Sequence, residues 1–269
     1  MTSNTLHSFR LARTLMIGAS VLAFAAGSAA AQTGSFATTP PTNSQTGTNG
    51  NTATHTAPSG TTSTGFQSGS NNRASVNNGA EGSGNSSAYA QTGNSNSVTV
   101  EQLGLQNSSS VQQSGDFNTA RHQRSGDRNS AGTFQQGNTH SSTATQQGSD
   151  NVAVVAQSHG DRNGSTISQG IRADGFTTAV NANRNTARVT QRGSDNASTV
   201  NQRANSAAGI EISDNAVTIV QGVDALLSNG NTSSVAQESR GNLAEVFQFE
   251  GGSSSLARNE SSITQQHQG

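Results

Sequence analysis

A step of 11 residues recurs through most of this 269-residue chain. Written from one glutamine to the next, the repeating unit is Q-x-G-x-x-N-x-(small)-x-(β-branched)-x-Q. It begins at Gln67 and, apart from short slips, continues in frame to Gln202. Beyond that point insertions separate half-units, the last of which ends at Gln265. Self-similarity on a short, fixed step predicts a stack of small units rather than one globular core.

The half of the unit that runs from Asn to Gln alternates with a period of two. Between Asn96 and Gln102, Val98 and Val100 share the parity of the two amides, and the residues between them are polar or charged. Such alternation predicts a β-strand. Across the units, the first middle position is usually Ala or Ser and the second is usually Val or Ile. This pairing suits the thin interior between two facing sheets.

Short glycine-containing sequences separate the strands, such as "GNS" before Asn96 and "GSD" before Asn151. Gly supplies a positive φ and Asp or Asn bonds nearby backbone, so these sequences predict tight turns. Eleven residues for a strand and a turn are too few for a βαβ unit. We therefore expect an all-β, cross-β fold over residues 67–265: a stacked strand–turn–strand β-solenoid of roughly eight two-strand rungs. A meander of antiparallel hairpins would also set amide opposite amide and is the alternative arrangement.

The composition excludes a conventional core. The chain is 29% hydrophobic and 11% charged, whereas a typical domain has about half apolar and about a quarter charged residues. Disorder usually accompanies high net charge or many prolines, but the formal net charge is −1 and the three prolines all precede residue 60. A disordered surface polymer is therefore a rival rather than the main interpretation. There is no Lys, and 14 Arg balance 15 acids, so no nucleic-acid partner is expected.

The N-terminus has the features of an export signal. Basic residues precede a short apolar run, and small residues follow it, which predicts a secretory signal peptide over residues 1–31 with cleavage between Ala31 and Gln32. Residues 32–66 are rich in Ser, Thr and Gly, lack the repeat, and are expected to form a disordered leader. The chain has no Cys, so no disulfide holds the exported fold.

Buried amides explain the fixed grid of Gln and Asn. An unpaired amide in an interior costs on the order of 1 to 3 kcal/mol, but identical amides stacked in register satisfy one another. The candidate ladder residues are Gln91, Asn96, Gln102, Asn107, Gln113, Asn118, Asn129, Gln135, Gln146, Asn151, Gln157, Asn185, Gln191, Asn196, Gln202, Asn242 and Gln248. The candidate turn glycines are Gly93, Gly104, Gly115, Gly126, Gly137, Gly148 and Gly193.

The pattern S-x5-Q-x-G-x2-N-x-A-x3-Q resembles the repeat of the curlin family, the subunits of bacterial curli fibres. The segment "ATQQGSDNVAVVAQ" matches it at Gln146, Gly148, Asn151, Ala153 and Gln157. "SVTVEQLGLQNSSSVQQ" also carries the pattern, with Ser in place of Ala. "QESRGNLAEVFQ" keeps its amides but has Ser where Gly is expected.

The resemblance implies an extracellular functional amyloid for adhesion and biofilm. It also implies export through the periplasm and an outer-membrane channel, a periplasmic chaperone, self-assembly with a related nucleator or major subunit, and a leader within residues 32–66 that addresses the channel. About seventeen strand units exceed the usual number of curlin repeats, and the C-terminal units are interrupted. The choice between major subunit, nucleator and anchoring subunit therefore stays open.

The remaining polar residues show no arrangement typical of catalysis. His122, His140 and His159 are interpreted as substituted ladder positions, because their spacing matches no metal site. Arg121, Arg124 and Arg128 are interpreted as a solvated basic face. Six aspartates recur in or beside turns: Asp116, Asp127, Asp150, Asp161, Asp195 and Asp214.

We interpret these aspartates as turn formers which, with Arg128 and Arg162, also slow premature aggregation. Calcium-binding β-rolls place Asp in repeated turns too, but on a glycine-richer nonapeptide. A monomeric secreted β-solenoid, such as a calcium-dependent or ligand-binding surface protein, is the main rival to the fibre subunit. No enzyme activity, metal or cofactor is expected: the chain lacks the G-x-S-x-G motif and, without Lys, any P-loop.

Overall fold

The computed structural model describes residues 42–46, 50–56, 60–79, 84–170, 182–203, 212–222, 230–249 and 259–266. All of these belong to one compact unit, residues 36–269. The expected signal peptide and the start of the leader, up to residue 41, lie outside the described residues. Within the described ranges the regular structure consists of strands alone, and no helix there is long and apolar enough to cross a membrane.

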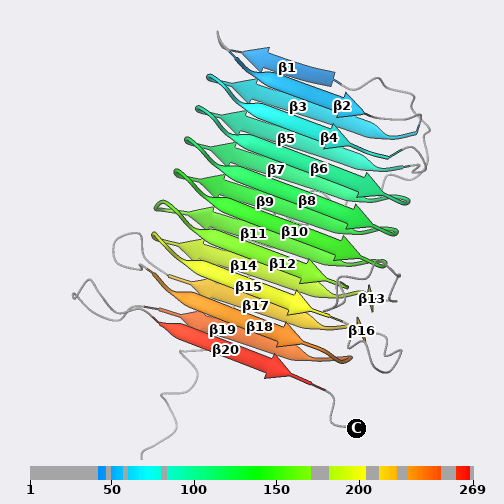
Figure 1. The fold of residues 1–269 in the computed structure, drawn as a ribbon, viewed down its shortest axis with the longest axis vertical. Coiled ribbons are helices and arrows are strands. Elements are labelled where there is room, and N and C mark those ends of the chain that lie inside the picture. The colour runs from blue at the N-terminus through cyan, green and yellow to red at the C-terminus, as the bar shows by residue number, and fades with distance from the viewer. Residues whose placement is uncertain are drawn as a thin grey trace, which may run out of the picture. The chain divides into compact units, whose positions relative to one another are not determined.

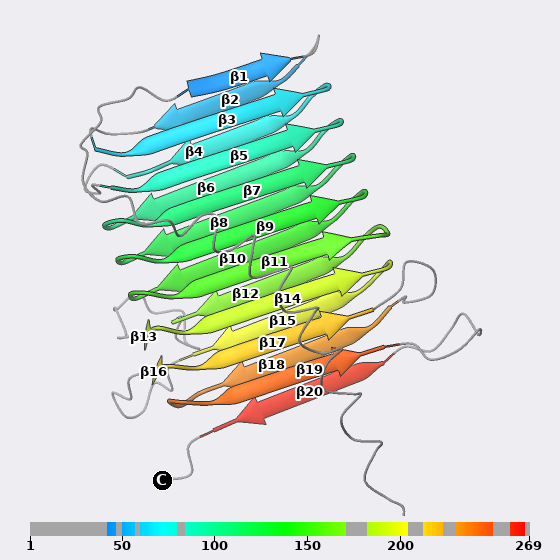
Figure 2. The same cartoon turned by 180° about the vertical axis from the view of Figure 1, so that it is seen from behind.

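Two nine-stranded sheets make up the fold (Figures 1 and 2). The first contains β1 (Thr42–Thr46), β3 (Thr62–Ser68), β5 (Ser86–Thr92), β7 (Ser108–Ser114), β9 (Ser130–Gln136), β11 (Val152–Ser158), β14 (Thr186–Arg192), β17 (Ala216–Gln221) and β19 (Leu243–Gln248). The second contains β2 (Thr52–Thr56), β4 (Arg73–Asn77), β6 (Ser97–Leu103), β8 (Thr119–Ser125), β10 (Ser141–Gln147), β12 (Gly164–Gln169), β15 (Ala197–Gln202), β18 (Thr232–Gln237) and β20 (Glu260–Gln265). β13 (Ala182–Asn183) and β16 (Ile212–Ser213) form a small separate pair.

Successive strands alternate between the sheets, and each strand pairs in parallel with its neighbours in the same sheet. This topology confirms the strand–turn–strand solenoid and contradicts the hairpin meander, in which consecutive strands would pair antiparallel. The nine strands per sheet are close to the roughly eight rungs expected.

The solenoid begins earlier than the sequence suggested. We expected residues 32–66 to be a disordered leader, but β1, β2 and most of β3 lie within this range and pair in register with the strands that follow. The prediction of disorder was wrong for these strands. They alternate like the later units, but Thr occupies many of their positions and most Gln and Asn markers of the repeat are missing.

The C-terminal insertions do not disturb the register. Residues 171–181, 204–211, 223–229 and 250–258 lie outside the described residues, yet Gln169 pairs opposite Gln202, and Gln202 opposite Gln237. The interrupted units therefore continue the same stack, because strand register is set by the inward-facing pattern and not by the length of the connection.

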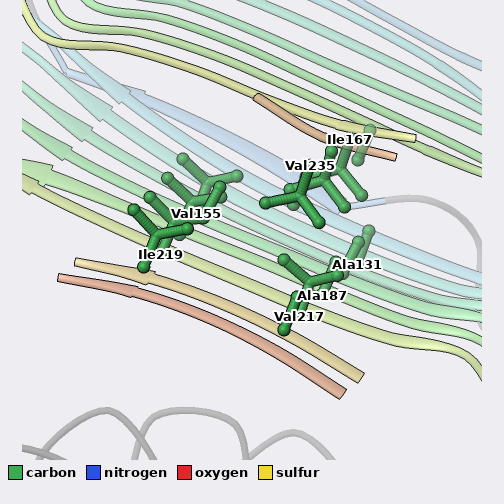
Figure 3. Close-up of a cluster of buried hydrophobic side chains, with 13 residues drawn as sticks. Ala131, Val155, Ile167, Ala187, Val217, Ile219 and Val235 are labelled. Carbon is green, nitrogen blue, oxygen red and sulfur yellow. The ribbon is translucent and has the colours of Figure 1, made fainter. Parts of the chain in front are cut away.

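The interior contains columns of small and β-branched side chains. In the first sheet, Ala153, Ala187 and Val217 lie one above another, and Val155, Val189 and Ile219 form the neighbouring column. Figure 3 shows these columns beside Ile167 and Val235 of the second sheet. The buried apolar residues form two clusters, one from Ala74 to Ala120 and the other from Ala131 to Val246.

Candidate assembly site: the amide ladders and the end strands

A column of glutamines follows the first sheet from rung to rung. Gln91 Nε2 donates to Gln113 Oε1 at 3.0 Å, Gln113 to Gln135 at 2.9 Å, and Gln135 to Gln157 at 2.9 Å. Gln191, Gln221 and Gln248 continue the column at 2.8–2.9 Å. The same Nε2 groups also donate to backbone carbonyls, such as that of Ser97 from Gln113. Each amide is thus satisfied only when the next rung is present.

The second sheet carries a matching column with one interruption. Gln146 donates to Gln169 and Gln169 to Gln202, both at 2.9 Å, and the column ends at Gln265. Between Gln102 and Gln146, however, the ladder position is Arg124. The side chain of Arg124 is buried and none of its three nitrogens has a hydrogen-bond partner.

The asparagines bridge rungs at the turns. Asn96 Oδ1 accepts from the backbone N–H of Asn118 at 2.9 Å, and Asn96 Nδ2 donates to the carbonyl of Gly115 at 2.7 Å. Asn107 makes the equivalent contacts with Asn129 and Gly126 at the opposite edge. These side chains mainly bind the backbone of the adjacent rung, but Asn151 Nδ2 also donates to Asn129 Oδ1, and Asn185 Nδ2 to Asn151 Oδ1, both at 3.1 Å.

The structure places all seventeen candidate amides in these columns. It adds Gln67, Gln169, Gln221, Gln237 and Gln265 to the glutamine columns, and Asn72, Asn85, Asn163, Asn215, Asn231 and Asn259 to the turn columns. The Asn-to-Gln spacing of the repeat was the signal for most of these additional residues.

The seven candidate glycines all have positive φ, between 94° and 128°. They also stack closely: a Cβ on Gly93 would collide with the carbonyl oxygen of Gly115, and one on Gly115 with that of Gly137. Glycine is therefore required at these turns for two reasons, the left-handed backbone and the approach of the next rung.

The turn aspartates also act between rungs. Asp116 accepts from the backbone N–H of Asn94 at 2.6 Å, and Asp127 and Asp161 make equivalent contacts with Leu105 and Asn138. Asp150, Asp195 and Asp214 instead form exposed, bidentate ion pairs with arginines. Their partners are Arg128, Arg162 and Arg184, respectively. No group of three or more His, Cys, Asp or Glu side chains with the geometry of a metal site occurs in the part of the chain that the structure describes.

Of the three histidines that were interpreted as substituted ladder positions, only His140 occupies one. His140 occupies an Asn position, since its backbone N–H donates to Asn118 Oδ1 at 2.9 Å and its Nδ1 accepts from Asn163 N–H at 3.2 Å. His122 instead lies in the β-branched column, between Val100 and Ala144, and is fully buried. His159 lies in a turn, with φ of 60°. The ladder assignment was therefore wrong for His122 and His159.

The interpretation of Arg121, Arg124 and Arg128 as a solvated face was also wrong in part. Arg121 and Arg128 have half-exposed side chains. Arg124 has the inward parity of its strand and is only 3% exposed. Three arginines close in sequence thus lie in three different environments: an outer sheet face, the interior and a turn.

At each end of the stack, the last described strand of each sheet has a neighbouring strand on one side only. β1 and β2 are the terminal strands at one end, and β19 and β20 at the other. The carbonyl of Asn259, just before β20, accepts from the N–H of Thr232 on β18, and the carbonyl of Gln265 on β20 accepts from the N–H of Glu238, just after β18. Because backbone groups alternate in direction along a strand, Glu260, Ser262 and Thr264 direct their N–H and C=O groups away from β18. Such an edge is a template for another strand.

The fold and its columns define a class of protein: a two-sheet, parallel β-solenoid whose rungs are joined by amide ladders. The family described as "Curlin associated repeat" matches residues 126–158, which span β9, β10 and β11. The chain thus carries a single match to the curlin repeat, over three consecutive strands of its solenoid, which supports its membership of the curlin family. A search of the curated proteins found no match.

Proposed function

We propose that the mature chain is a secreted structural subunit of a curli-like amyloid fibre, which grows by stacking of whole solenoids end to end. It serves adhesion and a biofilm matrix, and it has no catalytic role. The observation that carries the proposal is that both glutamine columns reach the C-terminal end strands, at Gln248 on β19 and at Gln265 on β20. The rung-to-rung contacts that hold one molecule together are repeated units, so a second copy can continue the strand pairing beyond these strands.

The direction of the ladders favours head-to-tail addition. Where two ladder glutamines are bonded to each other, in either column, Nε2 of one rung donates to Oε1 of the rung that follows it in sequence. Parallel addition therefore sets β1 and β2 of one copy on β19 and β20 of the next. Such a heterologous contact does not close on itself and generates a filament.

The resemblance to curlins supports the other parts of the proposal. These are export through the periplasm and an outer-membrane channel with the help of a chaperone, and assembly with a related nucleator or major subunit. The chain itself is then the major subunit, a nucleator or an anchoring subunit.

A thioflavin-T time course on residues 32–269 tests the proposal, with and without preformed seeds and with EDTA. We expect a lag that seeds abolish and that EDTA leaves unchanged. A soluble β-rich monomer that never converts, or that folds only with calcium, would contradict the fibre and favour the monomeric solenoid. Growth seeded equally well by a related curlin would indicate a partner subunit.

Edge variants make the test specific. Proline is tolerated on an edge strand where its missing N–H faces outward. Glu245 on β19 and Ser262 on β20 direct their N–H groups away from β17 and β18. The double variant Glu245→Pro/Ser262→Pro should fold but elongate poorly, while the control Glu245→Gln/Ser262→Thr elongates normally. Unchanged elongation of the proline variant would show that this end is not the growing surface.

A further inference from the structure

A polar belt interrupts the apolar interior between its two clusters. His122 Nδ1 contacts Ser109 Oγ at 2.8 Å, and His122 Nε2 contacts Thr133 Oγ1 at 2.9 Å. Thr133 Oγ1 in turn contacts Ser142 Oγ at 3.0 Å. These four residues come from β7, β8, β9 and β10, so the belt crosses between the sheets three times. Both ring nitrogens of His122 are thereby occupied by hydroxyl groups.

Arg124 lies two residues beyond His122, on the same inward parity. Its neighbours in register are Gln102 and Gln146. Nε, Nη1 and Nη2 are all buried and all without a partner. Elsewhere in this column, from Gln146 to Gln265, each position is a glutamine bonded to the next. Arg124 therefore brings unsatisfied donors into a site where the other rungs have none.

The site also carries an uncompensated charge. Burial lowers the pKa of Arg124 to about 9, so the guanidinium is still protonated at neutral pH. Burial, and secondarily the charge of Arg124, lowers the pKa of His122, which keeps the imidazole neutral. The buried polar residues described in the structure include no Asp or Glu. One positive charge is thus enclosed without a buried carboxylate among the described residues, and an unpaired charge in a protein interior is strongly unfavourable.

An unpartnered acceptor on the neighbouring rung does not balance this charge. Gln146 Oε1 is buried and also lacks a partner. The orientation of the Gln146 amide is set by Nε2, which donates to Gln169 Oε1 at 2.9 Å and to the carbonyl of Ser130 at 3.0 Å. Gln146 Oε1 can accept one N–H from the guanidinium, but it is neutral. Among the described residues, no buried carboxylate supplies the compensating charge.

We propose that Arg124 holds a small monovalent anion, chloride in a natural setting, inside the solenoid between β8 and β10. A single guanidinium balances one negative charge, and its fork of donors suits a compact anion. A bulky or doubly charged anion would either fail to fit the close-packed interior or reverse the imbalance. Because the site is closed once the rungs have stacked, the anion is captured during folding and exchanges slowly afterwards. The site does not depend on fibre assembly.

Bromide retention tests the site directly. The full mature chain is folded in sodium bromide and transferred by gel filtration into sodium gluconate, whose anion is too large to be enclosed. X-ray fluorescence then measures bromide per chain. We expect near-stoichiometric bromide in the unmodified protein and in Arg162→Gln, which alters an exposed arginine, but background bromide in Arg124→Gln. Background bromide in the unmodified protein would overturn the proposal and assign the site to water. The same bromide content in Arg124→Gln as in the unmodified protein would also overturn it.

A second measurement detects the bound anion through its effect on stability. Resistance to denaturant is compared in chloride and in gluconate at equal ionic strength. The unmodified chain should unfold at higher denaturant in chloride, whereas Arg124→Gln should show no difference between the two salts. Equal salt responses of the two proteins would contradict a specific anion. Circular dichroism of Arg124→Gln checks its fold, which is expected to persist because glutamine is the ladder residue of the other rungs.

Discussion

Gln135 Nε2 donates to Gln157 Oε1 at 2.9 Å, although the two residues are 22 positions apart in the chain. The same side chain accepts from Gln113 Nε2 at 2.9 Å. Gln135 therefore links three successive rungs of the first sheet. Its removal affects its own packing and also leaves one donor and one acceptor on the neighbouring rungs.

The substitution Gln135→Leu should lower the free energy of unfolding by about 2–4 kcal/mol, because Gln113 Nε2 and Gln157 Oε1 both lose a buried partner. Gln136→Leu is the matched control on the same strand, where the side chain is exposed. Guanidinium denaturation of both variants measures the difference. Equal midpoints for the two would show that the ladder adds little to stability.

Alanine substitutions at two glycines, one in a turn and one on a strand, test whether the turn geometry itself requires glycine. Gly115→Ala sets a Cβ against the carbonyl of Gly137 at a φ of 112°, and should cost about 1–3 kcal/mol from backbone strain alone. Gly132→Ala lies on β9, where nothing approaches within 4 Å, and should be neutral or slightly stabilising. Thermal melts of the two variants measure the contrast. If both alanines destabilise equally, the proposed close approach of the turns is wrong.

Arg124→Gln should stabilise the monomer by about 1–3 kcal/mol, since it completes the glutamine column and supplies a donor to Gln146 Oε1. The gain should be larger in gluconate than in chloride, where the anion already offsets the charge. Urea denaturation in each salt measures it. A loss of stability in both salts would mean that Arg124 has interior partners of its own.

Stability should fall on acidification because of His122. Its pKa is well below the usual 6.5 in the folded chain, owing to burial first and to Arg124 second. The unfolded chain therefore takes up a proton before the folded chain does. The contribution of neutral His122 is complete above about pH 6.5, is lost progressively below that value, and levels off beneath the folded pKa.

His122→Val places a β-branched residue in the column of Val100 and should reduce this pH dependence between about pH 7.5 and about pH 5. His55 and His140 also have lowered pKa values, mainly from burial, so a smaller slope of the same sign should remain. Urea midpoints across the range measure both slopes. An unchanged slope in His122→Val would assign the pH dependence to other groups.

Much of the architecture was predictable because the repeat reports local geometry. Period-two alternation predicted the strands, and glycine with Asp or Asn predicted the turns. Where these markers were missing the prediction failed, as for β1 and β2, whose Thr-rich alternation does occupy the same sheets. The burial of Arg124 had a signal as well, since it shares the parity of Ala120 and His122. The prediction placed Arg124 on a solvated face because of its charge and because Arg121 and Arg128 lie close to it in the sequence.

By itself, the sequence determined which residues form strands, which face inward and where the chain turns, because these depend on side-chain chemistry over a few neighbouring positions. Only the tertiary structure decided that the strands run parallel, and that Arg124 meets two glutamines in a closed interior. It also decided that Asp116 binds the rung above rather than only its own turn. These relationships join residues about two repeat units apart, and the local pattern is the same whether such residues stack, pair antiparallel or never meet.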